Sequence, residues 1–218
     1  MEGKIIGVGF QKTGTSTLRE ALRMLGYSVK DTTPRALIPI LKGNYNKVLS
    51  MLDGYDAMED TPWYMIYKEL DNYIPNSKFI LTIRDEESWY KSVSKHIGNL
   101  KAAHHEWIYG KGKALPSKDK KNAISVYRQH NLEVQEYFRD RPGDLLILDF
   151  TNGDQWEKLC EFLDKPMPDK PFPHYNKSIE MLKRQGTPKS RLRFYRHRLK
   201  NNLKIFYIKL LGLDHYGK

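Results

Sequence analysis

Near its start the chain reads Gly7-Val8-Gly9-Phe10-Gln11-Lys12-Thr13-Gly14-Thr15-Ser16-Thr17. The apolar run at residues 5–8 predicts a buried strand that leads into this loop. Leu18, Leu22 and Leu25 follow at helical spacing, so a helix is expected directly after the loop. In such a strand–loop–helix unit, successive backbone N–H groups point into one hollow at the positive end of the helix. The stretch therefore predicts a binding site for a phosphate or sulfate group, to which Lys12 adds a full positive charge.

The position of Lys12 separates this loop from the Walker A motif. In that motif the lysine follows the last glycine and precedes Ser or Thr, whereas Lys12 stands two residues before Gly14. The alternative is a turn that is capped by Thr15 or Ser16 and binds no ligand, because such caps are common. The hydroxyl-rich run after a hydrophobic strand favours the anion site.

Composition indicates a globular protein with one main domain. The chain has 218 residues, of which 39% are hydrophobic, with 4 Trp and 14 Tyr. Its single cysteine, Cys160, excludes an internal disulfide and is expected in the core. Residues 1–4 lack the composition of a secretory signal, and no apolar run is long enough to span a bilayer. We therefore expect a cytoplasmic location.

The positive charge is concentrated at the end of the chain. The formal net charge is +11, which suits an anionic ligand, a nucleic acid or an anionic membrane surface. Residues 183–211 are basic, and apolar side chains recur among them at helical spacing: Leu192, Tyr195, Leu199, Leu203 and Phe206. We expect a main domain at residues 1–182 and a basic amphipathic helix within 183–218. This helix either packs on the domain through its apolar side or contacts an anionic membrane or a nucleic acid.

Two further predicted strands end in side chains that suit a binding site. Residues 55–58 lead to Glu59 and Asp60, and either Asp60 or Thr61 is expected to cap the helix that follows. Residues 77–84 form the clearest strand, which ends at Arg84, and Ser92 follows two helical turns later. An arginine fork and a hydroxyl suit a phosphate. The alternatives are an ion pair of Arg84 with Asp85 or Glu87 and an ordinary surface serine.

The remaining segments complete an alternation of strands and helices. Short strands are expected at residues 27–29 and 145–148, and helices at residues 117–138, capped by Ser117, and around 156–163. Residues 98–121 are expected to form a mobile loop on which His104 and His105 are exposed to solvent. We expect no metal site there, because neighbouring side chains on an extended chain point in opposite directions.

Taken together, these motifs resemble those of the sulfotransferase family. The resemblance covers most of residues 4–177 and rests on Lys12–Leu18, Asp60–Pro62, Leu81–Ser92 and Pro171–Asn176. It implies a three-layer α/β sandwich with a central, mostly parallel sheet, similar to P-loop NTPases. It also implies transfer of a sulfuryl group from 3′-phosphoadenosine 5′-phosphosulfate to a hydroxyl or amine, without a metal.

The resemblance also implies roles for individual residues. The donor would be held by Gln11, Lys12, Thr13, Gly14, Thr15, Ser16 and Thr17 at its phosphosulfate and by Arg84 and Ser92 at its 3′-phosphate. Lys12 would stabilise charge on the leaving oxygen. The general base would be Asp60, with Glu59 second and His104 or His105 as further alternatives.

Two other functions stay open at this point. A small-molecule or nucleoside kinase would use a similar phosphate loop but should place its lysine directly before Ser or Thr. A nucleic-acid-binding protein would explain the charge but not the loop, so a nucleic-acid partner is not expected. The acceptor, whether a small molecule, a sugar or a lipid, is not identified by the sequence.

Overall fold

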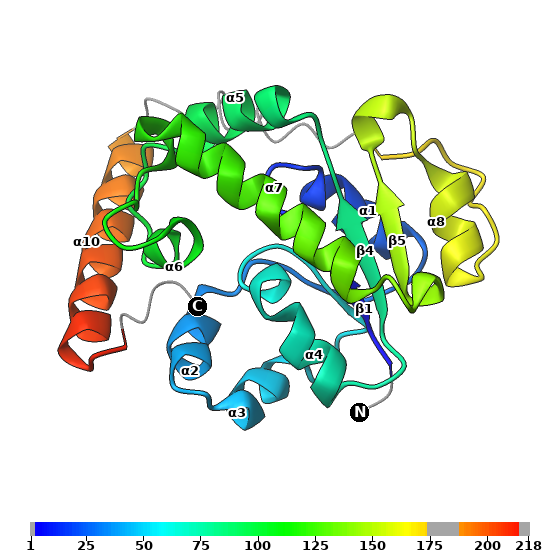
Figure 1. Ribbon diagram of the computed structural model, residues 1–218, viewed down its shortest axis with the longest axis horizontal. Coiled ribbons are helices and arrows are strands. Elements are labelled where there is room, and N and C mark those ends of the chain that lie inside the picture. The colour runs from blue at the N-terminus through cyan, green and yellow to red at the C-terminus, as the bar shows by residue number, and fades with distance from the viewer. Residues whose placement is uncertain (1–2, 174–187, 214–218) are drawn as a thin grey trace.

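The protein is organised around a five-stranded sheet with the strand order β2-β3-β1-β4-β5 (Figure 1). The computed structural model describes residues 3–173 and 188–213. All neighbouring strands pair in parallel. The strands are β1 (Ile5–Gly7), β2 (Val29–Lys30), β3 (Ala57–Met58), β4 (Lys78–Thr82) and β5 (Leu145–Leu148). Each lies within two residues of its predicted limits, and β1 is the middle strand.

Helices connect the strands. The α-helices in the described residues are α1 (Thr15–Met24), α2 (Leu37–Leu41), α3 (Tyr45–Leu49), α4 (Tyr67–Tyr73), α5 (Glu86–His96), α6 (His105–Tyr109), α7 (Lys120–Tyr137), α8 (Trp156–Leu163) and α10 (Pro188–Leu210). Shorter 3-10 turns are η1 (Pro34–Ala36), η2 (Ser50–Leu52), η3 (Trp63–Ile66), η4 (Pro116–Lys118), η5 (Pro142–Asp144) and η6 (Phe150–Asn152). None of these helices is both long and apolar enough to cross a membrane.

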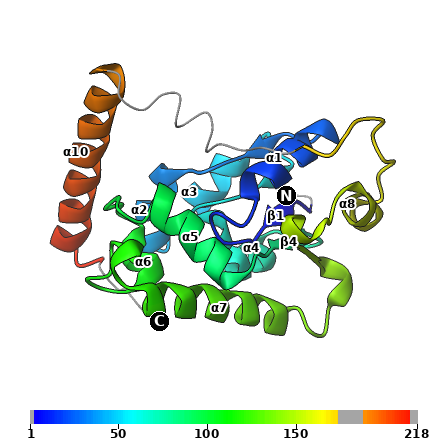
Figure 2. The same ribbon diagram turned by 90° about the horizontal axis from the view of Figure 1, so that it is seen from above.

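The sheet buries both of its faces. Side chains alternate along a strand, so Ile5 packs with α1 and α8 whereas Ile6 packs with α2, α3, α4 and α7. Cys160 lies in the first of these clusters, as expected. Seen from above, α1 and α7 lie on opposite sides of the sheet (Figure 2). The expected three-layer α/β sandwich of the P-loop type is therefore confirmed.

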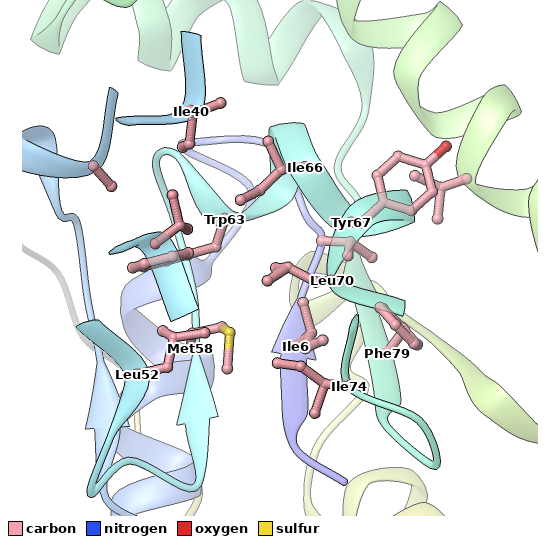
Figure 3. Close-up of a cluster of buried hydrophobic side chains, with 14 of the residues drawn as sticks. Ile6, Ile40, Leu52, Met58, Trp63, Ile66, Tyr67, Leu70, Ile74 and Phe79 are labelled. Atoms are coloured by element: carbon pink, nitrogen blue, oxygen red, sulfur yellow. The ribbon is translucent and has the colours of Figure 1, made fainter. Parts of the chain in front are cut away.

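The larger core cluster fixes the strand ends that matter for function. Figure 3 shows Ile6, Met58 and Phe79 from three adjacent strands packed beneath Trp63 and Leu70. All five side chains are fully buried, and each large apolar side chain contributes on the order of 2 kcal/mol by leaving water. Because β1 pairs with β3 on one side and β4 on the other, the ends of these three strands are held side by side.

Three local predictions are wrong. The segment from residue 98 to 121 is not a loop with exposed histidines, because it contains α6, in which His105 is 2% exposed. The next helix begins at Lys120 rather than near Ser117, because the Asp119 carboxylate accepts a hydrogen bond from Asn122 N–H and caps it. Finally, η3 has Pro62 at its N-cap, so neither Asp60 nor Thr61 caps it through a side chain.

The basic helix α10 packs on the body of the protein through a different face from the predicted one. Ile205 and Ile208 are buried against Leu37 and Ala103. In contrast, the predicted apolar stripe faces solvent, with Leu199 and Leu203 61% and 60% exposed. The side chain of Leu192 and the proposed domain boundary after residue 182 lie outside what the structure describes.

Candidate active site

The candidate site lies where β1, β3 and β4 end together. In open parallel sheets this edge holds the ligand, at the point where the strand order changes direction. The chain leaves β1 through Gly9, where an added Cβ would lie 1.9 Å from Thr82 Oγ1 and 2.7 Å from Thr82 N. Only glycine therefore allows the loop to pass directly against the end of β4.

The loop after β1 is a tight, closed turn. Lys12 and Gly14 have φ angles of 74° and 111°, both in the left-handed region. Thr13 closes the turn, because its N–H and its hydroxyl both donate to the Phe10 carbonyl at 3.2 and 2.6 Å. The same hydroxyl lies 2.6 Å from Thr82 Oγ1, which must be the donor there. The Thr13 side chain thus shapes the loop and has its own hydrogen bonds within the protein.

Helix α1 begins with donors that point out of the helix. Thr17 and Leu18 donate their N–H groups to the Gly14 carbonyl at 2.8 and 3.0 Å. The N–H groups of Thr15 and Ser16 occupy the first two helical positions, which precede the first bond within a helix. The N-cap is Gly14, without a side-chain bond, so Thr15 and Ser16 do not cap the helix as the alternative supposed. This end of α1 is suited to an anion.

The end of β3 places Asp60 beside this loop. The Thr15 hydroxyl donates to Asp60 Oδ2 at 3.3 Å, and Thr61 N–H donates to Oδ1 at 2.6 Å. Asp60 is partly buried and has a φ of 68°. Glu59, the adjacent carboxylate, is fully buried and lies 3.0 Å from the Arg19 guanidinium on α1. The structure therefore brings Asp60 to residues 9–17, here called the anion loop, whereas Glu59 joins α1 to the sheet.

The end of β4 presents Arg84 from the other side of β1. Arg84 N–H donates to Tyr127 Oη at 2.9 Å, and the Tyr127 hydroxyl donates to the Arg84 carbonyl at 2.8 Å. Arg84 Nε is buried and has no hydrogen-bond partner among the described residues. A buried donor without a partner costs about 1–3 kcal/mol, so it favours a ligand that supplies the acceptor.

The alternative considered for Arg84, an ion pair with Asp85 or Glu87, is absent from the described residues. Asp85 instead caps α5 by accepting the Ser88 N–H at 2.9 Å. Glu87 lies 2.8 Å from Lys120 Nζ. Both carboxylates that were the alternative partners of Arg84 are therefore engaged elsewhere.

Helix α5 connects the Arg84 end of the site to Lys12. Ser92 is partly buried, and His96 follows one turn later on the same side of the helix. Burial lowers the pKa of His96, and the positive charge of Lys12 lowers it further. Lys12 and His96 are therefore close enough for their charges to interact.

Three aromatic side chains, those of Trp89, Tyr109 and Tyr127, support the anion loop. The sequence patterns did not identify these side chains as part of the site. Trp89 Nε1 donates to the Gln11 carbonyl at 2.9 Å, and its ring stacks on Tyr127 with centroids 4.3 Å apart. Gln11 Nε2 donates to Tyr109 Oη at 2.9 Å, so this side chain points to α6. Trp89 lies within the Leu81–Ser92 motif. Tyr109 and Tyr127 come from distant segments, so no local sequence pattern predicts their contacts with the site.

His104 and His105 lie at the start of α6 and not on the exposed loop that was expected. His105 Nδ1 lies 2.9 Å from the Ala114 carbonyl, and burial lowers the pKa of this imidazole. His104 is partly buried. Within residues 3–173 and 188–213, no three or more potential ligand side chains lie together as a metal site would require.

The fold and this sheet edge define an α/β protein of the P-loop type, with a loop suited to an anion after its middle strand. The family model described as "Sulfotransferase domain" matches residues 4–116 and 100–181. The chain belongs to the sulfotransferase family and is an enzyme of that class. It is also similar to "Ava biosynthesis cluster protein M" of Aspergillus versicolor, with 27% identity over 78% of this chain and 80% of that protein.

Proposed function

We propose that the protein transfers a sulfuryl group from 3′-phosphoadenosine 5′-phosphosulfate to a hydroxyl or amine of an acceptor that is a small molecule, a sugar or a lipid. The observation that supports the donor is the buried Arg84 Nε, which has no hydrogen-bond partner within the described chain. Arg84 follows the end of β4, and β4 pairs with β1, the strand that leads into the anion loop. Two groups of residues suited to anions, at one sheet edge, would match a nucleotide that carries an anionic group at each end.

The residues present fit the two ends of this donor in different ways. Lys12 and the N–H groups of Thr15 and Ser16 suit the phosphosulfate, while Arg84 and Ser92 suit the 3′-phosphate. The side chains of Gln11 and Thr13 are engaged within the protein, so in this proposal they hold the loop in shape. Gly14 lets the loop pass against the Phe150 ring, since an added Cβ would lie 2.6 Å from that ring.

In this proposal the protein contributes a general base and electrostatic stabilisation to the sulfuryl transfer. As the acceptor oxygen or nitrogen forms its bond to sulfur, the bond between sulfur and the bridging oxygen of the donor breaks. The acceptor proton passes to the Asp60 carboxylate. The bridging oxygen leaves with the added negative charge, which the Lys12 ammonium and the start of α1 stabilise. Adenosine 3′,5′-bisphosphate and the sulfated acceptor are the products.

Asp60 is favoured over Glu59 as the general base. Asp60 is partly exposed and bonded to Thr15 on the anion loop. Glu59 is 0% exposed and lies 3.0 Å from Arg19, so proton uptake there would remove the closest and most buried partner of the arginine. His104 and His105 remain further alternatives, and the cytoplasmic location remains a prediction.

Ligand binding tests the donor assignment without an acceptor. We expect adenosine 3′,5′-bisphosphate to raise the melting temperature more than adenosine 5′-monophosphate does, since a ligand of the native state stabilises it. Arg84→Ala should reduce the affinity for the bisphosphate about 10- to 100-fold and leave that for the monophosphate nearly unchanged. Arg139→Ala, which changes an arginine that is 65% exposed, is the matched control.

Two results would contradict the proposal. Equal losses for both nucleotides in the Arg84 variant would show that this arginine does not contact the 3′-phosphate. Stabilisation by magnesium-ATP in place of the bisphosphate would indicate a kinase, and a response to nucleic acid alone would indicate a binding protein. Transfer itself is then measured with labelled donor and a panel of acceptors, with Lys12→Ala as the inactive variant.

A further inference from the structure

Helix α10 carries apolar side chains on two sides, and among the described residues only one of these sides is packed against the rest of the protein. On the inner side, Ile205 and Ile208 are buried against Leu37 and Ala103. Lys204 also faces inward, where its ammonium donates to the Pro34 carbonyl. These contacts attach the helix along the edge of the molecule beside α6 and α2 (Figures 1 and 2).

The other side, here called the outer stripe, is exposed. Its five members are between 60% and 70% exposed and recur at intervals of three or four residues: Tyr195, Leu199, Leu203, Phe206 and Leu210. At 3.6 residues per turn these side chains form one continuous line along the helix. Scattered surface leucines are ordinary, whereas a contiguous line of this length marks a contact surface.

Positive charge accompanies the outer stripe. Arg196, Arg198, Lys200 and Lys209 are all exposed on the same helix. No Asp or Glu occurs anywhere between residues 183 and 211. Apolar and aromatic side chains bordered by lysine and arginine are the pattern of helices that lie in the interface of an anionic bilayer.

We propose that α10 docks the protein on membranes that contain anionic lipids, with the outer stripe inserted among the acyl chains and the flanking cations at the phosphate level. A second copy of the chain fits this surface less well, because two such helices would bring like charges together. A nucleic acid would engage the cations but would leave the apolar line in water. This inference goes beyond the sulfotransferase chemistry and does not depend on it.

Vesicle sedimentation with the full chain tests the proposal. We expect the protein to sediment with phosphatidylcholine vesicles that contain about 30% phosphatidylserine, and only weakly with phosphatidylcholine alone, at about 0.1 M salt. The variant Leu199→Gln/Leu203→Gln/Phe206→Gln should lower the partition coefficient about 100-fold. Arg196→Gln/Lys200→Gln should lower the partition coefficient about 30-fold on the anionic vesicles only.

Matched controls separate the outer stripe from general effects. Leu132→Gln changes a leucine of α7 that is 55% exposed, and Lys121→Gln/Lys170→Gln removes two exposed cations from elsewhere. Both control variants should bind as the parent does. All substituted side chains are exposed, so unchanged melting temperatures are expected and show that the variants are folded.

Three outcomes would overturn the proposal. The first is no sedimentation with either vesicle, and the second is equal loss in the α7 control and the outer-stripe variant. The third comes from analytical ultracentrifugation: a dimer that dissociates in the outer-stripe variant, without vesicle binding by the parent, would make this surface an interface between copies.

Discussion

The buried ion pair between Arg19 and Glu59 offers the sharpest test of how the anion loop is held. The guanidinium lies 3.0 Å from the carboxylate, and the two side chains are 6% and 0% exposed. Burial alone would lower the pKa of Arg19, but the charges of Glu59 and Asp31 raise it above its ordinary value. The arginine is therefore fully charged and joins α1 to the end of β3.

Arg19→Met removes the charge and keeps most of the volume. Glu59 is then a buried carboxylate without its partner, which costs about 3–5 kcal/mol. The contacts of Arg19 with Glu20 and Asp31 are longer, at 3.4 Å, and these carboxylates are 29% and 55% exposed, so water replaces them at little cost. For a protein of this size each kcal/mol shifts the melting temperature by about 2–4 °C, so we expect a fall of about 6–20 °C.

The same helix provides a matched control. Arg23 pairs with Glu20 at 3.0 Å, but the two side chains are 45% and 29% exposed. Such surface pairs contribute about 0–1 kcal/mol, so Arg23→Met should lower the melting temperature by no more than about 4 °C. Calorimetry or denaturant unfolding of both variants at pH 7 gives the comparison.

A double variant tests the cause. Arg19→Met/Glu59→Leu removes both charges, and replacement of a buried pair by apolar side chains is close to neutral. We therefore expect it to recover most of the loss. The reasoning is refuted if Arg19→Met costs no more than Arg23→Met, or if the double variant is as unstable as the single one.

Three further predictions concern the site and its surroundings. Gly9→Ala should cost about 2–3 kcal/mol in unfolding free energy and abolish bisphosphate binding, because its Cβ would overlap Thr82. In the control Gly143→Ala, where nothing lies within 4 Å of the added Cβ, stability and bisphosphate binding should be unchanged. Asp60→Asn should lower kcat about 10²- to 10⁴-fold with bisphosphate affinity retained in calorimetric titrations, and full turnover would exclude it as the base. Because burial lowers the pKa of His105, the unfolded chain binds the proton more readily, so this residue makes stability fall as pH drops below about 6.5. The slope, up to about 1.4 kcal/mol per pH unit, should become shallower in His105→Gln in melts from pH 8 to 5, and an unchanged slope would contradict the assignment.

The sheet and the anion loop could be predicted because their signals are local. Short apolar runs bounded by loops identify all five strands, and glycine with lysine and hydroxyls identifies the turn after β1. The carboxyl ends of neighbouring parallel strands then bring Asp60, Lys12 and Arg84 to one edge as a matter of topology. No side-chain detail was needed for that step.

What could not be predicted depends on contacts between distant segments. The pairing of Glu59 with Arg19 joins residues 40 positions apart, and Tyr127 reaches Arg84 across 43. In α10 the spacing located an apolar stripe correctly but not the face that packs, because Ile205 and Ile208 form a second apolar side. The α6 segment, of 5 residues, is too short for periodicity to reveal.

The stacked rings of Trp89 and Tyr127 have a consequence for nucleotide selectivity. Trp89 is bonded to the backbone of the anion loop, and Tyr127 to both backbone groups of Arg84. The two ends of the site are thus attached to one rigid unit, with rings inclined by only 9°, and their separation is set before any nucleotide arrives. A regioisomer whose second phosphate leaves the ribose from the 2′ carbon would meet the same arginine at the wrong distance. With the proposed donor, we therefore expect the enzyme to distinguish the 2′ from the 3′ isomer through the spacing of its two anionic groups.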